Sequence, residues 1–235
     1  GHFTYNGKAY PMGQHGFARD TEFEQIAAGE DFVTYRLCAD EESKKKYPFD
    51  FVLEITHRLQ GNRLSVEWNV KNADDKEMYF TIGGHPAFNV NVLPDTDFED
   101  YSLAFKEGTE SLFYVLLDTE SGTAIADKTY ELKLTDSKYA LKKDMFDKDA
   151  LVFDNEQIEW AALALPDGKP YIALESKDFP NFGIWSKPGA PYVCLEPWCG
   201  RCDDKGFNGE ISQKPGINTL KAGEVFKKSY DITVY

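Results

Sequence analysis

Three short segments combine an ionisable side chain with glycine or proline and interrupt the strand patterns around them. They cover residues 14–20 (Gln-His-Gly-Phe-Ala-Arg-Asp), 83–89 (Gly-Gly-His-Pro-Ala-Phe-Asn) and 194–200 (Cys-Leu-Glu-Pro-Trp-Cys-Gly). Glycine lets a backbone bend or approach a ligand closely, and proline lacks an N–H and fixes the chain direction. Such segments can hold a reactive side chain at the end of a rigid strand.

Two of these segments each carry a side chain that could do chemistry. The reference pKa of histidine is about 6.5, so His85 can act as an acid near neutral pH, and Glu196 is a carboxylate that could lie at the mouth of a cleft. In a strand over 192–196, Tyr192, Cys194 and Glu196 share one face. Each residue also has a purely structural interpretation. Glu196 could be an exposed carboxylate at a strand end, and His85 could be a hydrogen-bonded structural histidine.

Other side chains in these segments could bind a small-molecule ligand. His15 and Arg19 lie in one short loop and could together hold a hydroxyl or an anionic group, since arginine matches phosphate well. A surface ion pair with Asp20 is the alternative for Arg19. Trp198 offers a flat apolar face on which a sugar ring could stack, although core packing would use the same property.

The cysteine content argues against a disulfide scaffold. Cys38, Cys194, Cys199 and Cys202 form no regular framework, so reduced thiols are favoured. The Cys-Gly-Arg-Cys of 199–202 has no second pair to complete a structural zinc site. No apolar stretch reaches the roughly 18 residues of a membrane span and no signal peptide is visible, so we expect a cytoplasmic protein.

The charge balance excludes some partners. The formal net charge is -14 and the isoelectric point about 4.7. A polyanion such as DNA or RNA, or an anionic membrane surface, would be repelled by that average field. We therefore expect neither nucleic acid nor membrane as a partner, and the sequence leaves the oligomeric state open.

Hydrophobic residues recur mostly with a period of two, which predicts strands. Between positions 49 and 70 apolar and polar residues alternate on both sides of Gly61-Asn62, which predicts an antiparallel hairpin. Asn6-Gly7 predicts another hairpin. Further strands are expected over 21–28, 32–39, 160–165, 171–175, 192–196 and 226–234, and short helical turns over 41–46 and 142–146. Together these patterns predict an all-β sandwich or barrel forming a single domain over residues 1–235.

Taken together and in this order, the segments resemble the aldose 1-epimerase family, most closely its LacX-like branch. The similarity lies in the His-Gly-Phe-Ala-Arg of 15–19, the Gly-Gly-His-Pro-Ala-Phe-Asn of 83–89, and Glu-Pro-Trp with the following Gly and Asp of 196–203. A weaker similarity lies in the Leu-Val-Phe-Asp of 151–154. The resemblance implies a large antiparallel β-sandwich of the galactose mutarotase type, with the sugar in a cleft across one sheet. It also implies that the family's N-terminal strands, and an arginine on them, are not part of this chain.

The resemblance implies roles for individual residues. The acid of the family falls on His85, its base on Glu196, and a second histidine that contacts the sugar on His15. Asp154 is similar to a sugar-binding aspartate, and Arg19 to an arginine that binds phosphate in hexose 6-phosphate members. The implied reaction interconverts the α and β anomers of a small-molecule aldose, such as galactose or another hexose, or of an aldose phosphate. It needs no cofactor and no metal.

Two other functions remain open from the sequence. A β-sandwich can bind carbohydrate without turning it over, because a fold does not determine a function. A glycoside hydrolase needs two carboxylates that flank a glycosidic bond, and Glu196 with Asp154 or Asp203 could supply them. Sugar binding without anomer exchange would indicate a binding module. Release of reducing sugar from an aryl glycoside would indicate a glycoside hydrolase.

Overall fold

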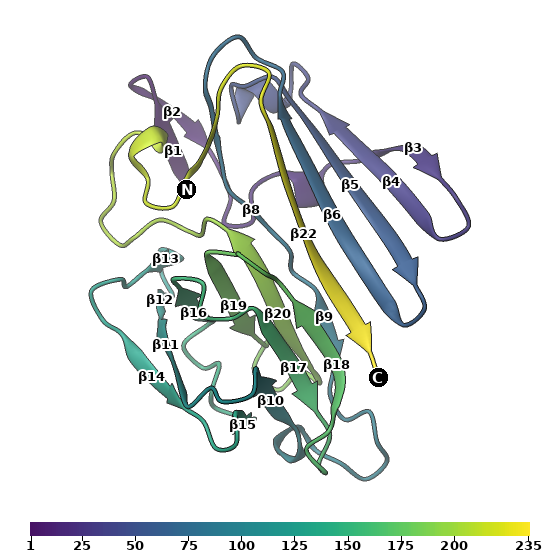
Figure 1. Cartoon of the computed structure of the whole chain (residues 1–235). Coiled ribbons are helices and arrows are strands. Elements are labelled where there is room, and N and C mark those ends of the chain that lie inside the picture. Colours follow the sequence, from purple (N-terminus) through teal and green to yellow (C-terminus); the bar gives the residue numbers. More distant parts are fainter. The chain divides into compact units, whose positions relative to one another are not determined.

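The computed structural model describes residues 1–235, and its contacts divide the chain into two compact units. The first unit comprises Gly1–Thr81 with Gly206–Asp231, and the second comprises Ile82–Lys205 with Ile232–Tyr235. Strands dominate both units (Figure 1). The single domain expected from the sequence is not tested by this division and stays a prediction.

The main sheet of the first unit contains the hairpin that the sequence predicted around Gly61. Gln60 lies opposite Arg63 in the register, and Gly61 has a φ of 61°, which glycine adopts without strain. The strands follow the order β22 (Val225–Val234), β6 (Arg63–Asn72), β5 (Phe51–Gln60), β4 (Phe32–Cys38) and β3 (Glu24–Ala28). Leu53, Val66, Trp68 and Val70 are buried along one face of the hairpin, as the period of two predicted.

Smaller elements complete the first unit. Asn6 and Gly7 both have positive φ, and they connect β1 (His2–Tyr5) to β2 (Lys8–Pro11) in the predicted hairpin. β7 (Met78–Phe80) pairs with β21 (Asn218–Leu220). Three short 3-10 helices are present, namely η1 (Ala18–Asp20), η2 (Ser43–Lys45) and η4 (Ile211–Gln213). Tyr5, Tyr47 and Phe49 belong to a cluster of aromatic rings in this unit.

The second unit contains two larger antiparallel sheets. One has the order β15 (Lys138–Ala140), β10 (Ser102–Phe105), β17 (Trp160–Ala164) and β18 (Pro170–Glu175). The other has the order β14 (Tyr130–Lys133), β11 (Ser111–Val115), β16 (Leu151–Asp154), β19 (Asn181–Trp185), β20 (Tyr192–Cys199) and β8 (Ile82–Gly83). The strand β9 (Ala87–Asn89) also pairs with β20.

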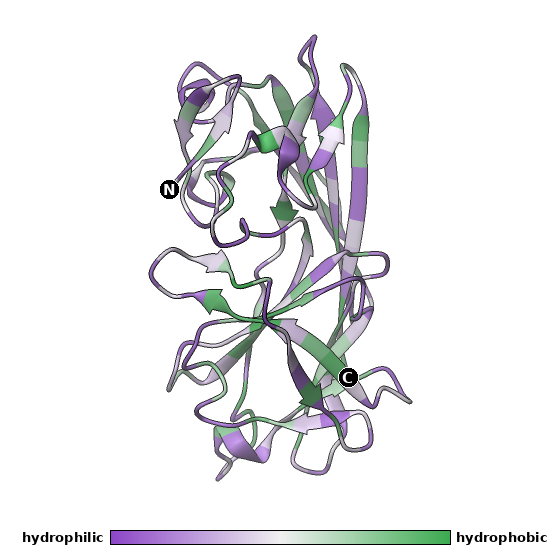
Figure 2. Ribbon diagram, turned by 90° about the vertical axis from the view of Figure 1, so that its left-hand side faces the viewer, coloured by the Kyte–Doolittle hydropathy of each residue, from purple (hydrophilic) through white to green (hydrophobic).

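Short elements join these sheets, and apolar side chains fill their interior. The small hairpin of β12 (Leu117–Asp118) and β13 (Thr123–Ala124) and the 3-10 helix η3 (Phe98–Asp100) lie between longer strands. Leu103, Leu163 and Leu174 of the first sheet and Ile184 and Leu195 of the second are fully buried. Figure 2 shows that the strands carry both hydrophobic and hydrophilic residues, whereas most of the connections are hydrophilic.

The prediction of an all-β, antiparallel fold is confirmed. Of the two helical segments expected, 41–46 contains the 3-10 helix Ser43–Lys45, whereas 142–146 forms only turns. Short segments of this kind make too few hydrogen bonds to nucleate an α-helix, so turns are the stable outcome. None of the helices is long and apolar enough to cross a membrane.

Candidate active site

The centre of the candidate site lies where the segment between β8 and β9, which carries Pro86, runs beside β20, which carries Pro197. The amide of Gly84 donates to the carbonyl of Pro197 at 3.0 Å, and the amide of Leu195 donates to the carbonyl of Pro86 at 3.2 Å. These bonds hold residues 84–86 against β20, between the pairings of β8 and β9 with that strand. His85 is thereby fixed opposite Glu196.

His85 and Glu196 form a cross-strand pair. The Nδ1 atom of His85 lies 3.5 Å from Oε1 of Glu196. The carboxylate side chain is only 4% exposed, whereas the imidazole is 41% exposed and therefore accessible. The imidazole also meets the ring of Trp185 edge-on, with ring centroids 6.0 Å apart. The sequence predicted these two residues as acid and base, and the fold brings them together from positions far apart in the chain.

Glu196 is the only Asp, Glu, Lys, Arg or His among the buried residues. Burial raises the pKa of its carboxyl group to about 8, because a charged carboxylate loses its hydration there. The indole N–H of Trp198 counteracts part of that rise in pKa, and the charge of Asp149 adds to it. A buried carboxylate with an elevated pKa beside an accessible imidazole is a candidate for general base catalysis.

The indole of Trp198 lies flat across the strands on both sides of β20. A Cβ atom on Gly83 of β8 would come within 2.4 Å of the indole, and so would a Cβ atom on Gly183 of β19. Both neighbouring strands therefore need glycine beside this ring. Gly83 lies in a motif that the sequence shows, whereas Gly183 gives no local signal, because Trp198 becomes its neighbour only when β19 and β20 pair.

Cys194 shares the face of β20 that carries Glu196, as the alternation of the strand predicted. Its side chain is 1% exposed, and burial raises the pKa of its thiol to about 12. The sulfur of Cys194, a ring nitrogen of His85 and a carboxylate oxygen of Glu196 all lie within 4.8 Å of one another.

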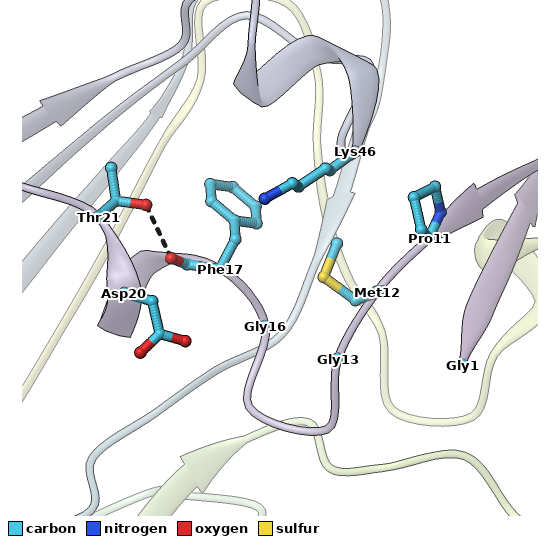
Figure 3. Close-up of a pocket in the computed structure, with 9 residues that line it drawn as sticks. All are labelled: Gly1, Pro11, Met12, Gly13, Gly16, Phe17, Asp20, Thr21 and Lys46. Carbon is cyan, nitrogen blue, oxygen red and sulfur yellow. Dashed lines mark hydrogen bonds between the residues drawn. The ribbon is translucent and has the colours of Figure 1, made fainter.

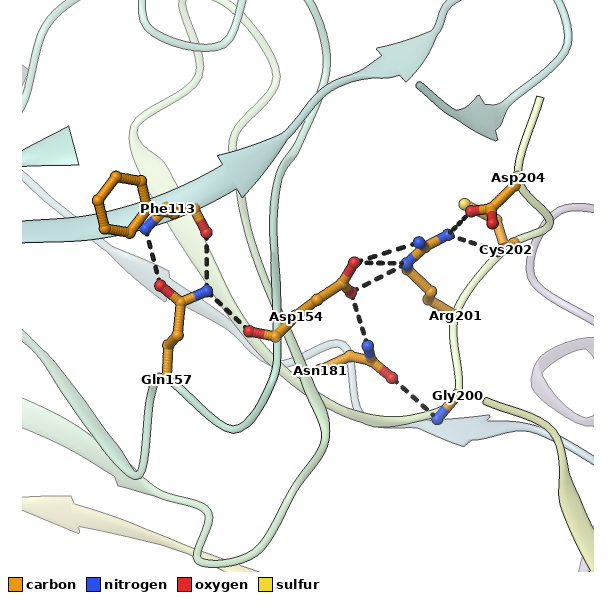
Figure 4. Close-up of polar contacts among 8 residues, drawn as sticks. All are labelled: Phe113, Asp154, Gln157, Asn181, Gly200, Arg201, Cys202 and Asp204. Atoms are coloured by element: carbon orange, nitrogen blue, oxygen red, sulfur yellow. Dashed lines mark hydrogen bonds and ion pairs between the residues drawn. The ribbon is translucent and has the colours of Figure 1, made fainter. Parts of the chain in front are cut away.

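Asp154, predicted to bind sugar, takes part in a polar network at the end of β20 (Figure 4). Its carboxylate accepts hydrogen bonds from Nε and Nη2 of Arg201 and, at 2.7 Å, from Nδ2 of Asn181. The side chain of Arg201 is only 11% exposed and also donates to Asp204 at 2.7 Å. Asn181 accepts from the amide of Gly200 at 3.2 Å, so the network anchors the chain just after Trp198.

Arg201 and Asn181 were not singled out from the sequence. The only available signal was the position of Arg201 directly after the Glu-Pro-Trp segment, and its partner Asp154 is 47 residues away along the chain. Buried arginine is rare unless it is paired, and here two carboxylates pair with it. Binding of sugar by Asp154 stays a prediction beside this structural role.

His15 and Arg19 belong to the first unit, and their loop is shown in Figure 3. The loop lines a cavity of about 280 Å³ with Phe17, Asp20 and Lys46 among its walls. The exposed guanidinium of Arg19 pairs with Asp20 at 3.2 Å, which is the surface ion pair that the sequence left open. Sugar contact by His15 and phosphate binding by Arg19 stay predictions.

Comparison with known proteins places these features in a family. Residues 2–233 match the model of the family described as aldose 1-epimerase. The chain is 30% identical over 224 residues to the plasmid-encoded protein LacX of Lactococcus lactis subsp. lactis, an alignment that covers 94% of this chain and 74% of that protein.

Solved structures give the same result at the level of the fold. The galactose mutarotase related enzyme from Lactobacillus acidophilus has a TM-score of 0.92 and 32% identity, with coverage of 100% of this chain and 78% of that one. A galactose mutarotase-like protein from Lactobacillus casei has a TM-score of 0.87 and 30% identity, with coverage of 100% and 80%. The expected β-sandwich of the galactose mutarotase type is thereby confirmed, and this chain belongs to the aldose 1-epimerase family.

Proposed function

We propose that this protein is an aldose 1-epimerase that interconverts the α and β anomers of an aldose by general acid–base catalysis. Glu196 acts as the base and His85 as the acid. The observation that carries the proposal is the cross-strand pair itself, in which the buried carboxylate lies 3.5 Å from the imidazole. Family membership supports the reaction class, and the geometry supports the assignment of roles.

The reaction must open a hemiacetal ring and close it from the other face. In the forward direction Glu196 takes the proton of the C1 hydroxyl while His85 protonates the ring oxygen, and the C1–O5 bond breaks to give the open-chain aldehyde. Rotation about the C1–C2 bond presents the other carbonyl face. The two residues then exchange roles as the ring closes, so no proton is gained or lost over a cycle.

The elevated pKa of Glu196 suits this task. A carboxylate of ordinary pKa is a weak base toward a sugar hydroxyl, whereas one raised to about 8 by burial is a stronger base. The adjacent imidazole can share the single proton that the pair needs for catalysis. General acid and general base groups each contribute about 10²–10⁴-fold in rate.

The proposed substrates are free aldoses such as galactose and glucose, with aldose phosphates as the second class. The names of the similar structures support galactose as the first sugar to test. Arg19, His15 and Asp154 are proposed as additional contacts to the substrate, and Arg19 is the residue that would favour a phosphate.

Nuclear magnetic resonance exchange spectroscopy tests the proposal directly. Galactose, glucose and glucose 6-phosphate at anomeric equilibrium are each mixed with the protein at a pH where spontaneous exchange is slow. We expect faster exchange between the α and β signals for at least one sugar, and the fastest identifies the substrate class. Saturable sugar binding without faster exchange would instead indicate a binding module.

A further inference from the structure

The side chains that form the acid–base pair belong to a larger donor set. Beside the imidazole nitrogen of His85 and the carboxylate of Glu196 lies the sulfur of Cys194, which the proposed reaction does not use. All three donor atoms lie within 4.8 Å of one another. Cys194 and Glu196 are two residues apart on one face of β20, and His85 reaches them from the neighbouring segment.

We propose that His85, Cys194 and Glu196 form a three-ligand zinc site, and that Zn²⁺ inhibits the enzyme by occupying its acid–base pair. Imidazole nitrogen, thiolate sulfur and carboxylate oxygen are the three donor types that zinc uses in proteins, and three protein ligands leave a fourth position for water or substrate. The inhibition rests on the proposed function, whereas the binding of the metal does not.

The distances suit this ion. Zinc binds nitrogen and oxygen at about 2.0–2.2 Å and sulfur at about 2.3 Å, so neighbouring ligand atoms of a tetrahedral site are roughly 3.4–3.7 Å apart. The 3.5 Å between Nδ1 of His85 and Oε1 of Glu196 already matches that spacing. Metal binding has to close the widest separation of 4.8 Å by about 1 Å, a shift that small changes in side-chain torsion within their rotamer wells can supply.

The charges also suit a divalent cation. A thiolate and a carboxylate side by side in a buried site repel each other, and each loses hydration when it is charged. With Zn²⁺ present, the two anions and the neutral imidazole give a total charge of zero, and a coordinated thiol is deprotonated outright. Calcium and magnesium prefer oxygen ligands in greater number, so this set favours zinc and similar metals over them.

Cobalt provides a readout that is independent of catalysis. Co²⁺ substitutes for Zn²⁺ in such sites, and a cysteine thiolate bound to it gives a charge-transfer band in the near ultraviolet. We expect the full chain, freed of metal with EDTA, to develop this band at one equivalent of Co²⁺ and to lose it when Zn²⁺ is added. The absence of a thiolate band at saturating cobalt would overturn the proposal.

Two cysteine variants separate this site from the Cys-Gly-Arg-Cys segment. Cys199 is buried on β20 in register with Ile82, on the face opposite to Glu196, and serves as the matched control. We expect Cys194→Ser to weaken metal binding at least about 100-fold, and Cys199→Ser to leave it unchanged. Loss of the cobalt band in Cys199→Ser with retention in Cys194→Ser would assign the metal to the other segment and refute the site.

The effect on catalysis is measured within each variant as the ratio of exchange rates with and without zinc. We expect zinc to slow anomer exchange by the wild type and by Cys199→Ser, and EDTA to restore it. The ratio should approach one for Cys194→Ser. If no sugar is epimerised by any form, the cobalt band still decides whether the metal binds, so failure of the proposed function and failure of the metal site are distinguishable.

Discussion

At the scale of the residue, the main feature is a carboxylate held where water cannot hydrate it. Glu196 is 4% exposed, and the groups facing it are His85, Cys194, Asp149 and the indole of Trp198. Of these only the Trp198 N–H and a protonated His85 favour the charged form of the carboxylate. Two measurable consequences follow, one for catalysis and one for stability.

The pH dependence of catalysis should report the raised pKa of Glu196. The base must be deprotonated to act, so kcat/KM should rise with pH through the pKa of Glu196 in the free enzyme. We expect the acid limb of the profile to have its midpoint near 8 rather than near the ordinary carboxyl value of 4.5. The profile is measured with EDTA present and corrected for spontaneous exchange. A midpoint below about 5 would mean that the carboxylate is solvated.

The same group should make stability depend on pH. The folded-state pKa of Glu196 lies above its unfolded value, so its contribution is fully present below about pH 4.5 and is lost as the pH rises through about 8. Glutamine does not ionise, so Glu196→Gln does not lose stability as the pH rises. We expect the variant to exceed the wild type in free energy of unfolding at pH 9 by an amount on the order of a few kcal/mol, and to match it at pH 4. Urea unfolding at both pH values checks this, and an equal difference at both would contradict it.

At the scale of the element, the site depends on how β20 pairs on its two sides. β19 supplies Gly183 and Asn181, and the segment between β8 and β9 supplies His85. Both prolines accept a hydrogen bond in this pairing and neither needs to donate one. Pairing with β20 therefore continues past both prolines, with His85 on one side of the strand and Asn181 on the other.

Local patterns explain what the sequence could predict at this scale. The hairpins at Asn6-Gly7 and Gly61-Asn62 depend on turn residues and alternation that lie next to each other in the chain. The pairing of Asp154 with Arg201 and the contact of Trp198 with Gly183 depend on the order of strands in a sheet, which no local pattern encodes. His85 and Glu196 were assigned by family resemblance rather than by spacing.

Gly183→Ala tests the packing of the Trp198 indole. The new Cβ atom would meet the ring at 2.4 Å, so the ring must shift from its position beside Glu196. We expect a destabilisation of about 1–3 kcal/mol and a decrease in kcat of about 10- to 100-fold. Gly13→Ala is the control, since its nearest neighbour would be at an ordinary 3.8 Å. Full activity of Gly183→Ala would show that the position of the indole does not matter.

At the scale of the whole molecule, the net charge of -14 sets how charged substrates approach. The electrostatic field of this net charge does not affect a neutral aldose, whereas it repels a sugar phosphate with two negative charges. Any preference for phosphosugars must therefore come from local cations such as Arg19, acting against the charge of the molecule.

Ionic strength separates the two substrate classes. The screening length falls from about 30 Å at 0.01 M salt to about 8 Å at 0.15 M, which weakens the repulsion at long range. We expect the KM for glucose 6-phosphate to decrease at least about twofold over this range while the KM for galactose stays constant. An increase in KM with salt would indicate that local cations, rather than the net charge, dominate the approach of the phosphate.

The most direct measurement is anomer exchange by the wild type beside Glu196→Gln and His85→Asn, using the best sugar substrate. Glu54→Gln serves as the control, because Glu54 is a half-buried glutamate that pairs with Arg36 in the first unit. We predict that each site variant loses about 10²–10⁴-fold in kcat while sugar binding remains detectable, and that the control retains its rate. Turnover near the wild-type rate in Glu196→Gln or His85→Asn would contradict the assignment of that residue to the acid–base pair.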